Sequence, residues 1–260
     1  MRPYFCRRNM SAYRDPFGYP KWSKRLVILV FGVVTWYRMN RVNKLHVKGA
    51  EHIADLDEHN VLFVSNHQTY FMDVASMLLA MFHVHHGMIN RADRVWPFLR
   101  PRTNIYYIAA KETMKGGLLP RLFALSGSVS IKRTWREAGQ NIQRGVDPSD
   151  VDNIRKAIRS GWVITFPQGT TKPYVKGRRG TAHLITELEP IVVPIVIDGY
   201  RRAFDKKGLR MKKRGVDLSM TFKAPITYDQ AESPQEIMDR IMDAIEQSPK
   251  YQHPFRNLDA

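Results

Sequence analysis

The feature that most constrains the fold is the alternation of short β-rich runs with helical stretches from residue 44 onward. Runs rich in β-branched and aromatic residues predict seven strands, at Lys44–Lys48, Val61–Ser65, Ile105–Ala109, Val129–Lys132, Trp162–Phe166, Val192–Ile197 and Leu218–Phe222. Helices are predicted between them, near Met72–Phe82, Leu118–Leu125, Arg136–Gln143, Asp150–Arg159 and Ala182–Leu188, with a last helix that begins after Ser233. Parallel neighbours need such crossover connections, so the pattern predicts an α/β fold with a largely parallel central sheet flanked by helices.

The N-terminal segment differs from the rest, because twelve apolar or near-apolar residues, Leu26–Tyr37, lie there between basic clusters. A helix that spans a bilayer needs about 20 such residues, so this run is too short. It also ends in Trp-Tyr-Arg, unlike the small-residue cleavage site of a signal peptide. We therefore predict a basic segment over residues 1–43 with a helix in the membrane interface, followed by one domain over residues 44–260. The alternative is a helix that packs on the protein's own core.

The formal net charge of +17 comes from two segments. Residues 1–48 carry eleven Lys or Arg and one acid, and Arg201–Arg214 carries eight and one, so the rest of the chain is balanced. Such segments attract anionic membranes or phosphate groups, although a solvated basic loop is an equal alternative for the second one. Aromatic residues do not alternate with this second segment beyond Phe204, and no nucleic-acid-binding motif is apparent. We expect an anionic membrane surface as the partner and no nucleic acid. The single cysteine, Cys6, excludes a disulfide framework.

The stretch from His83 to Asn104 has no clear periodicity and predicts an irregular, ordered excursion or lid. Its three histidines, His83, His85 and His86, are potential metal ligands. No nearby cysteine or carboxylate cluster completes a site, so we predict a surface loop and no metal.

Candidate chemistry follows the run Val61–Ser65, where Asn66 and His67 precede a predicted helix that contains Asp73. A histidine at the carboxyl end of a strand lies where open α/β sheets bind ligands. A neighbouring aspartate can hold the imidazole in one tautomer, so that it removes a proton from a hydroxyl group. Taken alone, such a pair is more often a structural cap.

Three further segments carry turn residues and cations. Gly127 permits a tight entry to a strand that ends at Arg133, whose guanidinium can bind a phosphate by two hydrogen bonds. The segment Phe166-Pro167-Gln168-Gly169-Thr170 makes a turn after a strand, and basic residues follow it. The run Ile191–Ile197, which contains Pro194, predicts a buried strand that leads into the second basic segment.

These four segments, in this order, resemble those of the glycerolipid acyltransferases of the lysophosphatidic acid acyltransferase family. The resemblance implies a glycerol-phosphate acyltransferase-like fold, a membrane-facing helix before it, and a role in phospholipid biosynthesis at the cytoplasmic face of the inner (plasma) membrane. It also implies transfer of a fatty acyl group from coenzyme A or acyl carrier protein to a lysophospholipid, most simply 1-acyl-glycerol-3-phosphate, with no metal or other cofactor. By this resemblance His67 is the general base and Asp73 its partner. The resemblance also implies a substrate-binding set, namely Asn66, Gly127, Arg133, Phe166, Pro167, Gln168, Gly169, Thr170 and Pro194.

Two features depart from the family's pattern. Five residues separate His67 from Asp73 instead of four, and six positions on a regular helix advance about 600°, so contact between the two requires a non-helical turn. Gln168 stands where the family usually has glutamate, which removes a negative charge. Two alternatives stay open: acylation of another lysolipid, such as a lyso-aminolipid, and a non-catalytic peripheral membrane protein on the same fold.

Overall fold

The computed structural model describes residues 13–112, 147–229 and 231–252, and, between the first two ranges, residues 117, 122, 124–132, 136, 137, 140, 141 and 145. The predicted helix at 118–125 and Arg133 lie largely or wholly outside the described residues.

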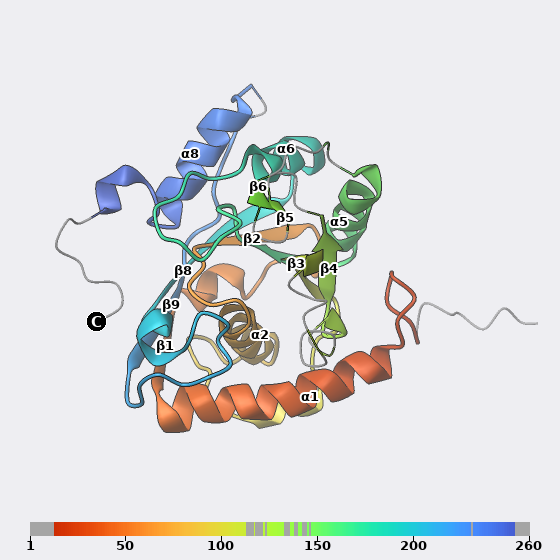
Figure 1. The fold of residues 1–260 in the computed structure, drawn as a ribbon. Helices are drawn as coiled ribbons and strands as arrows, with labels where there is room; N and C mark the ends of the chain where they lie inside the picture. Colours follow the sequence, from red (N-terminus) through yellow and green to blue (C-terminus); the bar gives the residue numbers. More distant parts are fainter. Residues whose placement is uncertain are drawn as a thin grey trace, which may run out of the picture.

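A seven-stranded sheet forms the centre of the protein, in the order β1-β9-β8-β2-β7-β3-β4 (Figure 1). Its strands are β1 (Lys44–Lys48), β2 (Val61–Ser65), β3 (Ile105–Ala110), β4 (Ser128–Ile131), β7 (Trp162–Thr165), β8 (Ile191–Asp198) and β9 (Asp217–Phe222). Neighbouring strands are parallel except for the antiparallel pair β8–β9. The largely parallel sheet predicted from the sequence is therefore confirmed, with all seven strands close to their expected positions.

Helices cover both faces of the sheet. The longer ones are α1 (Lys21–Tyr37), α2 (Met72–His85), α5 (Pro148–Ser160), α6 (Arg179–Leu188) and α8 (Pro234–Ala244). The short ones are η2 (Arg38–Val42), η3 (Ala50–Ile53), η4 (Trp96–Leu99), α7 (Tyr200–Ala203) and η5 (Pro249–Tyr251). In α8, Ser233 caps the helix and exchanges hydrogen bonds with Glu236, as the sequence predicts.

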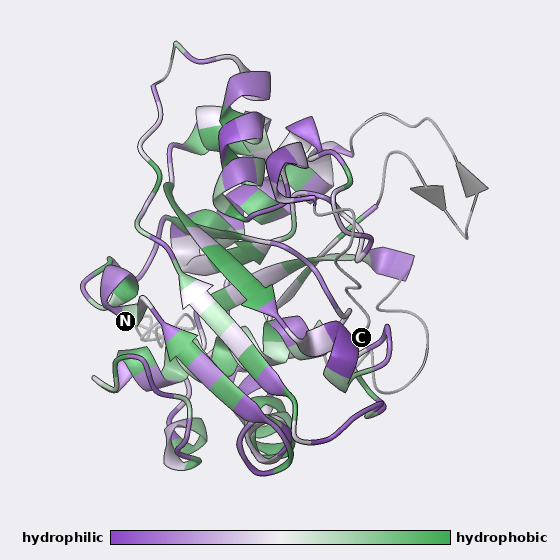
Figure 2. Cartoon of the chain, turned by 90° about the vertical axis from the view of Figure 1, so that its left-hand side faces the viewer, coloured by the Kyte–Doolittle hydropathy of each residue, from purple (hydrophilic) through white to green (hydrophobic). Residues whose placement is uncertain are grey.

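Two cores form because successive side chains of a strand point to opposite faces. In β2, Val61 and Phe63 belong to the core under α1 and α2, whereas Leu62 and Val64 belong to the core under α5, α6 and α8. All five residues of β2 are buried, as expected for a central strand of a parallel sheet. At the sheet edge, β1 alternates hydrophilic and hydrophobic residues (Figure 2). Helix α2 lies between the sheet and α1 (Figure 1), so its residues from Met72 to Val84 are all buried.

Helix α1 has one face on the protein and one face exposed. The buried face carries Lys24, Ile28, Gly32 and Thr35. A Cβ atom at Gly32 would lie 2.3 Å from the Phe98 ring, so the glycine allows η4 to pack closely against α1. The exposed face carries large apolar residues, namely Trp22, Leu26, Val30, Val33, Val34 and Tyr37. No helix in the described part of the chain is both long and apolar enough to cross a bilayer.

Lys24 is a buried lysine in this packing. Its Nζ donates a hydrogen bond to the Ile105 carbonyl at 3.1 Å and lies 4.3 Å from the centre of the Tyr106 ring. Burial lowers its pKa to about 7, an effect that Asp15 partly opposes. Gly127 has φ +127°, and a Cβ there would lie 2.5 Å from the Ile105 carbonyl oxygen and 2.8 Å from Lys24 Nζ. Gly127 thus makes room for α1 at the amino end of β4.

Two sequence-based predictions are wrong in detail. Residues 136–143 were expected to form a helix, but Arg136–Glu137 (β5) and Gln140–Asn141 (β6) pair as antiparallel strands. Gly139 lies between them in the sequence, and glycine disfavours a helix interior by about 1 kcal/mol while it favours hairpin turns.

The irregular stretch expected from His83 begins later, because α2 continues to His85. His83 is fully buried, bonded through Nδ1 to the Leu79 carbonyl at 2.8 Å and through Nε2 to the Arg94 N–H at 3.0 Å. It is therefore a structural residue and not part of a surface loop. The described residues contain no group of His, Cys, Asp and Glu suited to a metal ion.

Candidate active site

The histidine and the aspartate that the sequence nominates lie together at the carboxyl end of the sheet. His67 follows β2, and its Nδ1 lies 2.9 Å from Asp73 Oδ2 in the first turn of α2. An ionised carboxylate only accepts hydrogen bonds, so Nδ1 carries the proton and Nε2 is left as a base. The Phe166 ring stacks on the imidazole at a centroid distance of 3.9 Å and further restricts its orientation.

Asp73 is held by more than the histidine. Its carboxylate accepts hydrogen bonds from the backbone N–H of Gln68 at 2.6 Å, from that of Thr69 at 2.9 Å, and from the Thr69 hydroxyl at 2.7 Å. The residue is completely buried, so these donors replace the water that would otherwise solvate its charge. The turn from His67 to Asp73 is non-helical, as the spacing of five residues requires.

The second basic segment supports this turn. The backbone N–H groups of Tyr70 and Phe71 donate to the carbonyls of Lys206 and Lys207, both at 3.1 Å. Gly208 has φ +77° and touches the turn so closely that a Cβ there would lie 2.8 Å from the Met72 nitrogen. The backbone groups left unpaired by the longer turn are thus satisfied by a segment more than 130 residues away in the sequence.

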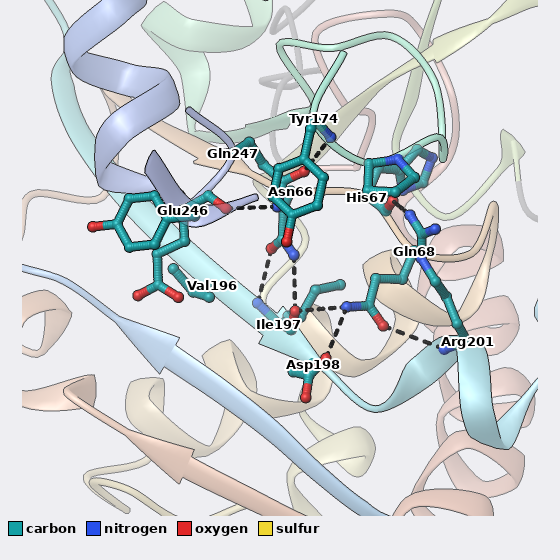
Figure 3. Close-up of a pocket in the computed structure, with 12 residues that line it drawn as sticks. Asn66, His67, Gln68, Tyr174, Val196, Ile197, Asp198, Arg201, Glu246 and Gln247 are labelled. Carbon is teal, nitrogen blue, oxygen red and sulfur yellow. Dashed lines mark hydrogen bonds between the residues drawn. The ribbon is translucent and has the colours of Figure 1, made fainter. Parts of the chain in front are cut away.

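The side chains of Asn66 and Gln68 bond the turn that contains His67 to the backbone at the end of β8 (Figure 3). Asn66 donates to the Ile197 carbonyl and accepts from the Ile197 N–H, both at 2.8 Å. Gln68 also donates to the Ile197 carbonyl, at 2.9 Å, and accepts from the Arg201 N–H at 3.2 Å. Because both polar atoms of Asn66 bond to backbone, the structure gives this residue a positioning role beside a small polar cavity of about 60 Å³ that His67 also lines.

A much larger cavity of about 610 Å³ lies on another side of His67. Its walls are apolar near the histidine, with Tyr70, Val74, Ile108, Ile131, Ile154 and Leu184 among the lining residues. Four residues of the predicted substrate-binding set, Phe166, Pro167, Gly169 and Thr170, also line it. Charged residues, including Lys132, Asp147 and Arg179, line the rest. Hydrogen bonds from Ser149, together with Lys132, lower the pKa of Asp147 to about 2, so this part of the lining is charged at neutral pH.

Gln168 lies outside this cavity, although the sequence analysis placed it at the substrate. Its side chain is buried, with 1% of its surface exposed, and its Nε2 donates to the Val175 carbonyl at 3.1 Å and to Gln247 Oε1 at 3.3 Å. Oε1 of Gln247 also accepts from the Tyr174 N–H at 3.0 Å. Gln168 therefore connects the turn after β7 to Gln247, in the segment that follows α8, by a hydrogen bond.

Gly127 and Pro194 do not line any of the cavities described here either. Gly127 packs against α1, and Pro194 lies within the sheet, where it pairs with Val64. Both are expected in the substrate site by the family resemblance, and for both that role stays a prediction. Arg133 lies outside the described residues.

The comparisons with known proteins come from the chain's sequence and from its fold. Residues 44–198, more than half of the chain, match the family described as Acyltransferase. The chain belongs to the acyltransferase family. The prediction of an acyltransferase from the four sequence segments is thereby confirmed.

A solved structure shares the fold of this acyltransferase. It is the 1-acyl-sn-glycerophosphate (LPA) acyltransferase PlsC from Thermotoga maritima, with a TM-score of 0.53 and 18% sequence identity. The match covers 85% of this chain and 76% of the other. No protein of curated function matches the chain by sequence.

Sequence analysis missed the side chains that complete the acyltransferase's site. Gln68 follows His67 directly in the sequence. The residues around Gln68 in the sequence do not indicate that its side chain bonds to β8. Arg201 was seen only as one of eight basic residues, although its Nη2 donates to the His67 carbonyl at 3.2 Å and to the Thr171 carbonyl. These contacts join segments that lie far apart in the sequence, so no local sequence pattern predicts them.

Proposed function

We propose that this acyltransferase transfers a fatty acyl group from an acyl-thioester to the free hydroxyl of a lysophospholipid, with 1-acyl-glycerol-3-phosphate as the simplest acceptor. Coenzyme A or acyl carrier protein would carry the acyl group, and the product would be a phosphatidic acid used in phospholipid biosynthesis. The observation that carries the proposal is the His67–Asp73 pair, whose histidine lines both a large apolar cavity and a small one and whose aspartate is buried.

In this mechanism, His67 Nε2 removes the proton from the acceptor hydroxyl as its oxygen attacks the thioester carbonyl. Asp73 keeps the imidazole in the required tautomer and stabilises the imidazolium that forms. The tetrahedral intermediate then collapses, the carbon–sulfur bond breaks, and the imidazolium returns the proton to the departing thiolate. The acyl group ends as an ester on the acceptor and the donor leaves as a thiol.

The apolar cavity supports an acyl chain as part of the substrate. Its volume of about 610 Å³ exceeds what a small polar metabolite needs, and its apolar lining beside His67 favours hydrocarbon. An acyl chain there would also displace water from the thioester, which suppresses hydrolysis.

The exposed face of α1 supports a membrane-bound acceptor. Six large apolar residues of α1 face solvent, and Val95, Trp96 and Leu99 from the neighbouring η4 region add to them. Exposed apolar patches of this kind mark sites of membrane or protein contact. The basic residues around α1 suit anionic headgroups, so we propose peripheral binding with α1 in the interface. The cytoplasmic face of the inner membrane is the location that the family resemblance implies.

The test is acyl transfer by the purified protein in vesicles. A labelled acyl-coenzyme A and an acyl carrier protein thioester would each be offered with a panel of acceptors that includes 1-acyl-glycerol-3-phosphate and a lyso-aminolipid. Formation of labelled phosphatidic acid in preference to other products is expected. Transfer only to the lyso-aminolipid would contradict the acceptor assignment, and vesicle binding without any transfer would contradict the catalytic role.

A further inference from the structure

A third cavity, of about 420 Å³, lies beside the turn between His67 and Asp73, because Gln68 lines it. Four of its eight lining residues are cations, Lys172, Arg201, Lys206 and Lys212, and the others are Gln68, Thr171, Pro173 and Phe204. No carboxylate is among these lining residues. A cavity with this lining favours a compact anion.

Three of the four cations, the lysines, are not neutralised by acids of the described residues. In the described part of the chain, Lys172, Lys206 and Lys212 form no ion pair, and Lys212 Nζ instead donates to the Arg201 carbonyl at 3.0 Å. Asp205, which precedes Lys206 in the sequence, accepts from the backbone N–H groups of Leu209 and Arg210, at 2.8 and 3.0 Å. Its carboxylate is thus used inside the loop. The lysine ammonium groups therefore keep N–H donors that could bond to an anion in the cavity.

The cavity is joined to the general base by two residues. Gln68, which follows His67 in the chain, lines the small polar cavity (Figure 3) and also this one. Arg201 also lines both and donates from Nη2 to the His67 carbonyl at 3.2 Å. An anion bound here would therefore lie next to residues that contact the histidine.

We propose that this cavity, lined by Lys172, Arg201, Lys206 and Lys212, binds the phosphate ester of the acceptor. The inference rests on the proposed function and adds a phosphate site that is independent of Arg133. In a glycerol phosphate the acceptor hydroxyl is only a few bonds from the phosphate, which suits a site adjacent to His67. The phosphates of coenzyme A are separated from the thioester by the whole pantetheine arm, so they fit this position less well.

The proposal predicts that removal of two cations from the cavity weakens acceptor binding. In the double variant Lys206→Gln/Lys212→Gln, the KM for 1-acyl-glycerol-3-phosphate should rise about tenfold or more, while the KM for the acyl-thioester stays unchanged. The matched control is Lys213→Gln/Arg214→Gln, which removes the same charge from the same loop at exposed residues that do not line the cavity.

A binding measurement separates this site from the reaction. Glycerol 3-phosphate should bind to the wild-type protein and to the control variant more tightly than to the cavity variant, and glycerol should not bind detectably to any of them. If the wild type bound glycerol 3-phosphate in this manner but transferred no acyl group, the proposed reaction would fail and the phosphate site would stand.

Two results would overturn the proposal. Equal acceptor KM values in the cavity and control variants would show that the position of the cations does not matter. The basic loop would then attract the acceptor only through its total positive charge. A rise in the KM for the acyl-thioester alone would assign the cavity to the donor's phosphates.

Discussion

At the scale of single residues, the polar surroundings of a buried side chain decide what it can do. Asp73 is buried among donors, which suits a carboxylate. Gln168 is buried among acceptors, the Val175 carbonyl and Gln247 Oε1, which suits an amide. The family's usual glutamate is therefore replaced here by a residue that donates hydrogen bonds to its neighbours.

The variant Gln168→Glu should be destabilised at neutral pH and recover in acid. A carboxylate that faces two oxygens at a buried position has its pKa raised, so the charged form disfavours folding. The destabilisation, about 1–3 kcal/mol, is then absent below the carboxyl's unfolded pKa and grows as the pH rises through the higher folded value. Thermal unfolding at about pH 5 and pH 8 checks this, with Gln252→Glu, at an exposed residue, as the control. Equal melting temperatures for both variants at the higher pH would contradict it.

Lys24 should make the stability of the protein rise with pH. Burial lowers its pKa from the ordinary value of 10.5 to about 7 in the folded protein. Between these values the unfolded chain holds the proton and the folded chain does not, so the free energy of unfolding increases with pH by up to about 1.4 kcal/mol per unit. The variant Lys24→Met should lack this contribution. Denaturant unfolding of both proteins from about pH 7 to pH 9 measures the difference, which should widen in favour of the wild type. A constant difference would show that Lys24 does not titrate in this range.

At the scale of elements, the turn between His67 and Asp73 is supported by the loop at residues 206–208, which belongs to the other half of the chain. The turn is longer than the family's by one residue, and Lys206, Lys207 and Gly208 pack against the additional backbone. We infer that the loop is a positioning element for the His67–Asp73 pair as well as the wall of the anion-binding cavity.

The variant Gly208→Ala should lower kcat at least about tenfold with little change in the KM for the acyl-thioester. A Cβ at this position would lie 2.8 Å from the Met72 nitrogen and 2.9 Å from Thr69 Oγ1, so the loop must move away from the turn. Gly215→Ala is the matched control, because Gly215 also has positive φ, +71°, but nothing lies within 4 Å of its Cβ position. Steady-state kinetics of the two variants measures the effect. Equal kcat values would show that the loop does not position the pair.

The elements that could be predicted from the sequence are those with a strong local signal. The strands are short runs of β-branched and aromatic residues, and Val61–Ser65 was placed without error. The segment at 136–143 lacks such a signal, because helix-forming residues flank Gly139, which favours a turn between the paired strands β5 and β6.

The site was only partly predictable for a related reason. His67, Asp73 and the turn at Phe166 follow strand ends, and the edge of a parallel sheet brings strand ends together. Gln168 and Pro194 belong to the same motifs, but their side chains point into the protein, which a motif does not indicate. The support of the turn by Gly208 depends on tertiary contacts that no local pattern contains.

At the scale of the whole molecule, the exposed apolar face of α1 is the surface that we propose for docking on an anionic membrane. The face is exposed although it carries Trp22, Leu26 and Val30, while the opposite face of the helix packs on the domain. This arrangement reconciles the two sequence-based alternatives for the helix, because it packs on the protein's core and still presents apolar residues outward. Membrane binding itself stays a prediction.

The triple variant Leu26→Ser/Val30→Ser/Val34→Ser should bind anionic vesicles at least about tenfold more weakly than the wild type. Its melting temperature should change little, because the three residues are 46–55% exposed. Vesicle sedimentation measures the binding, and transfer to a short-chain acceptor dissolved as monomers controls for the integrity of the active site. Unchanged vesicle binding would show that α1 does not dock on the membrane.

We propose that His67 and Asp73, although separated by five residues, form a working pair for acyl transfer. The most direct measurement is the rate of acyl transfer to 1-acyl-glycerol-3-phosphate in vesicles by the wild type and by His67→Ala, with folding and vesicle binding of both proteins verified. We predict that the wild type is active and that the variant is slower by about a thousandfold or more. Transfer by the variant at the wild-type rate would contradict the role of His67 and with it the mechanism proposed here.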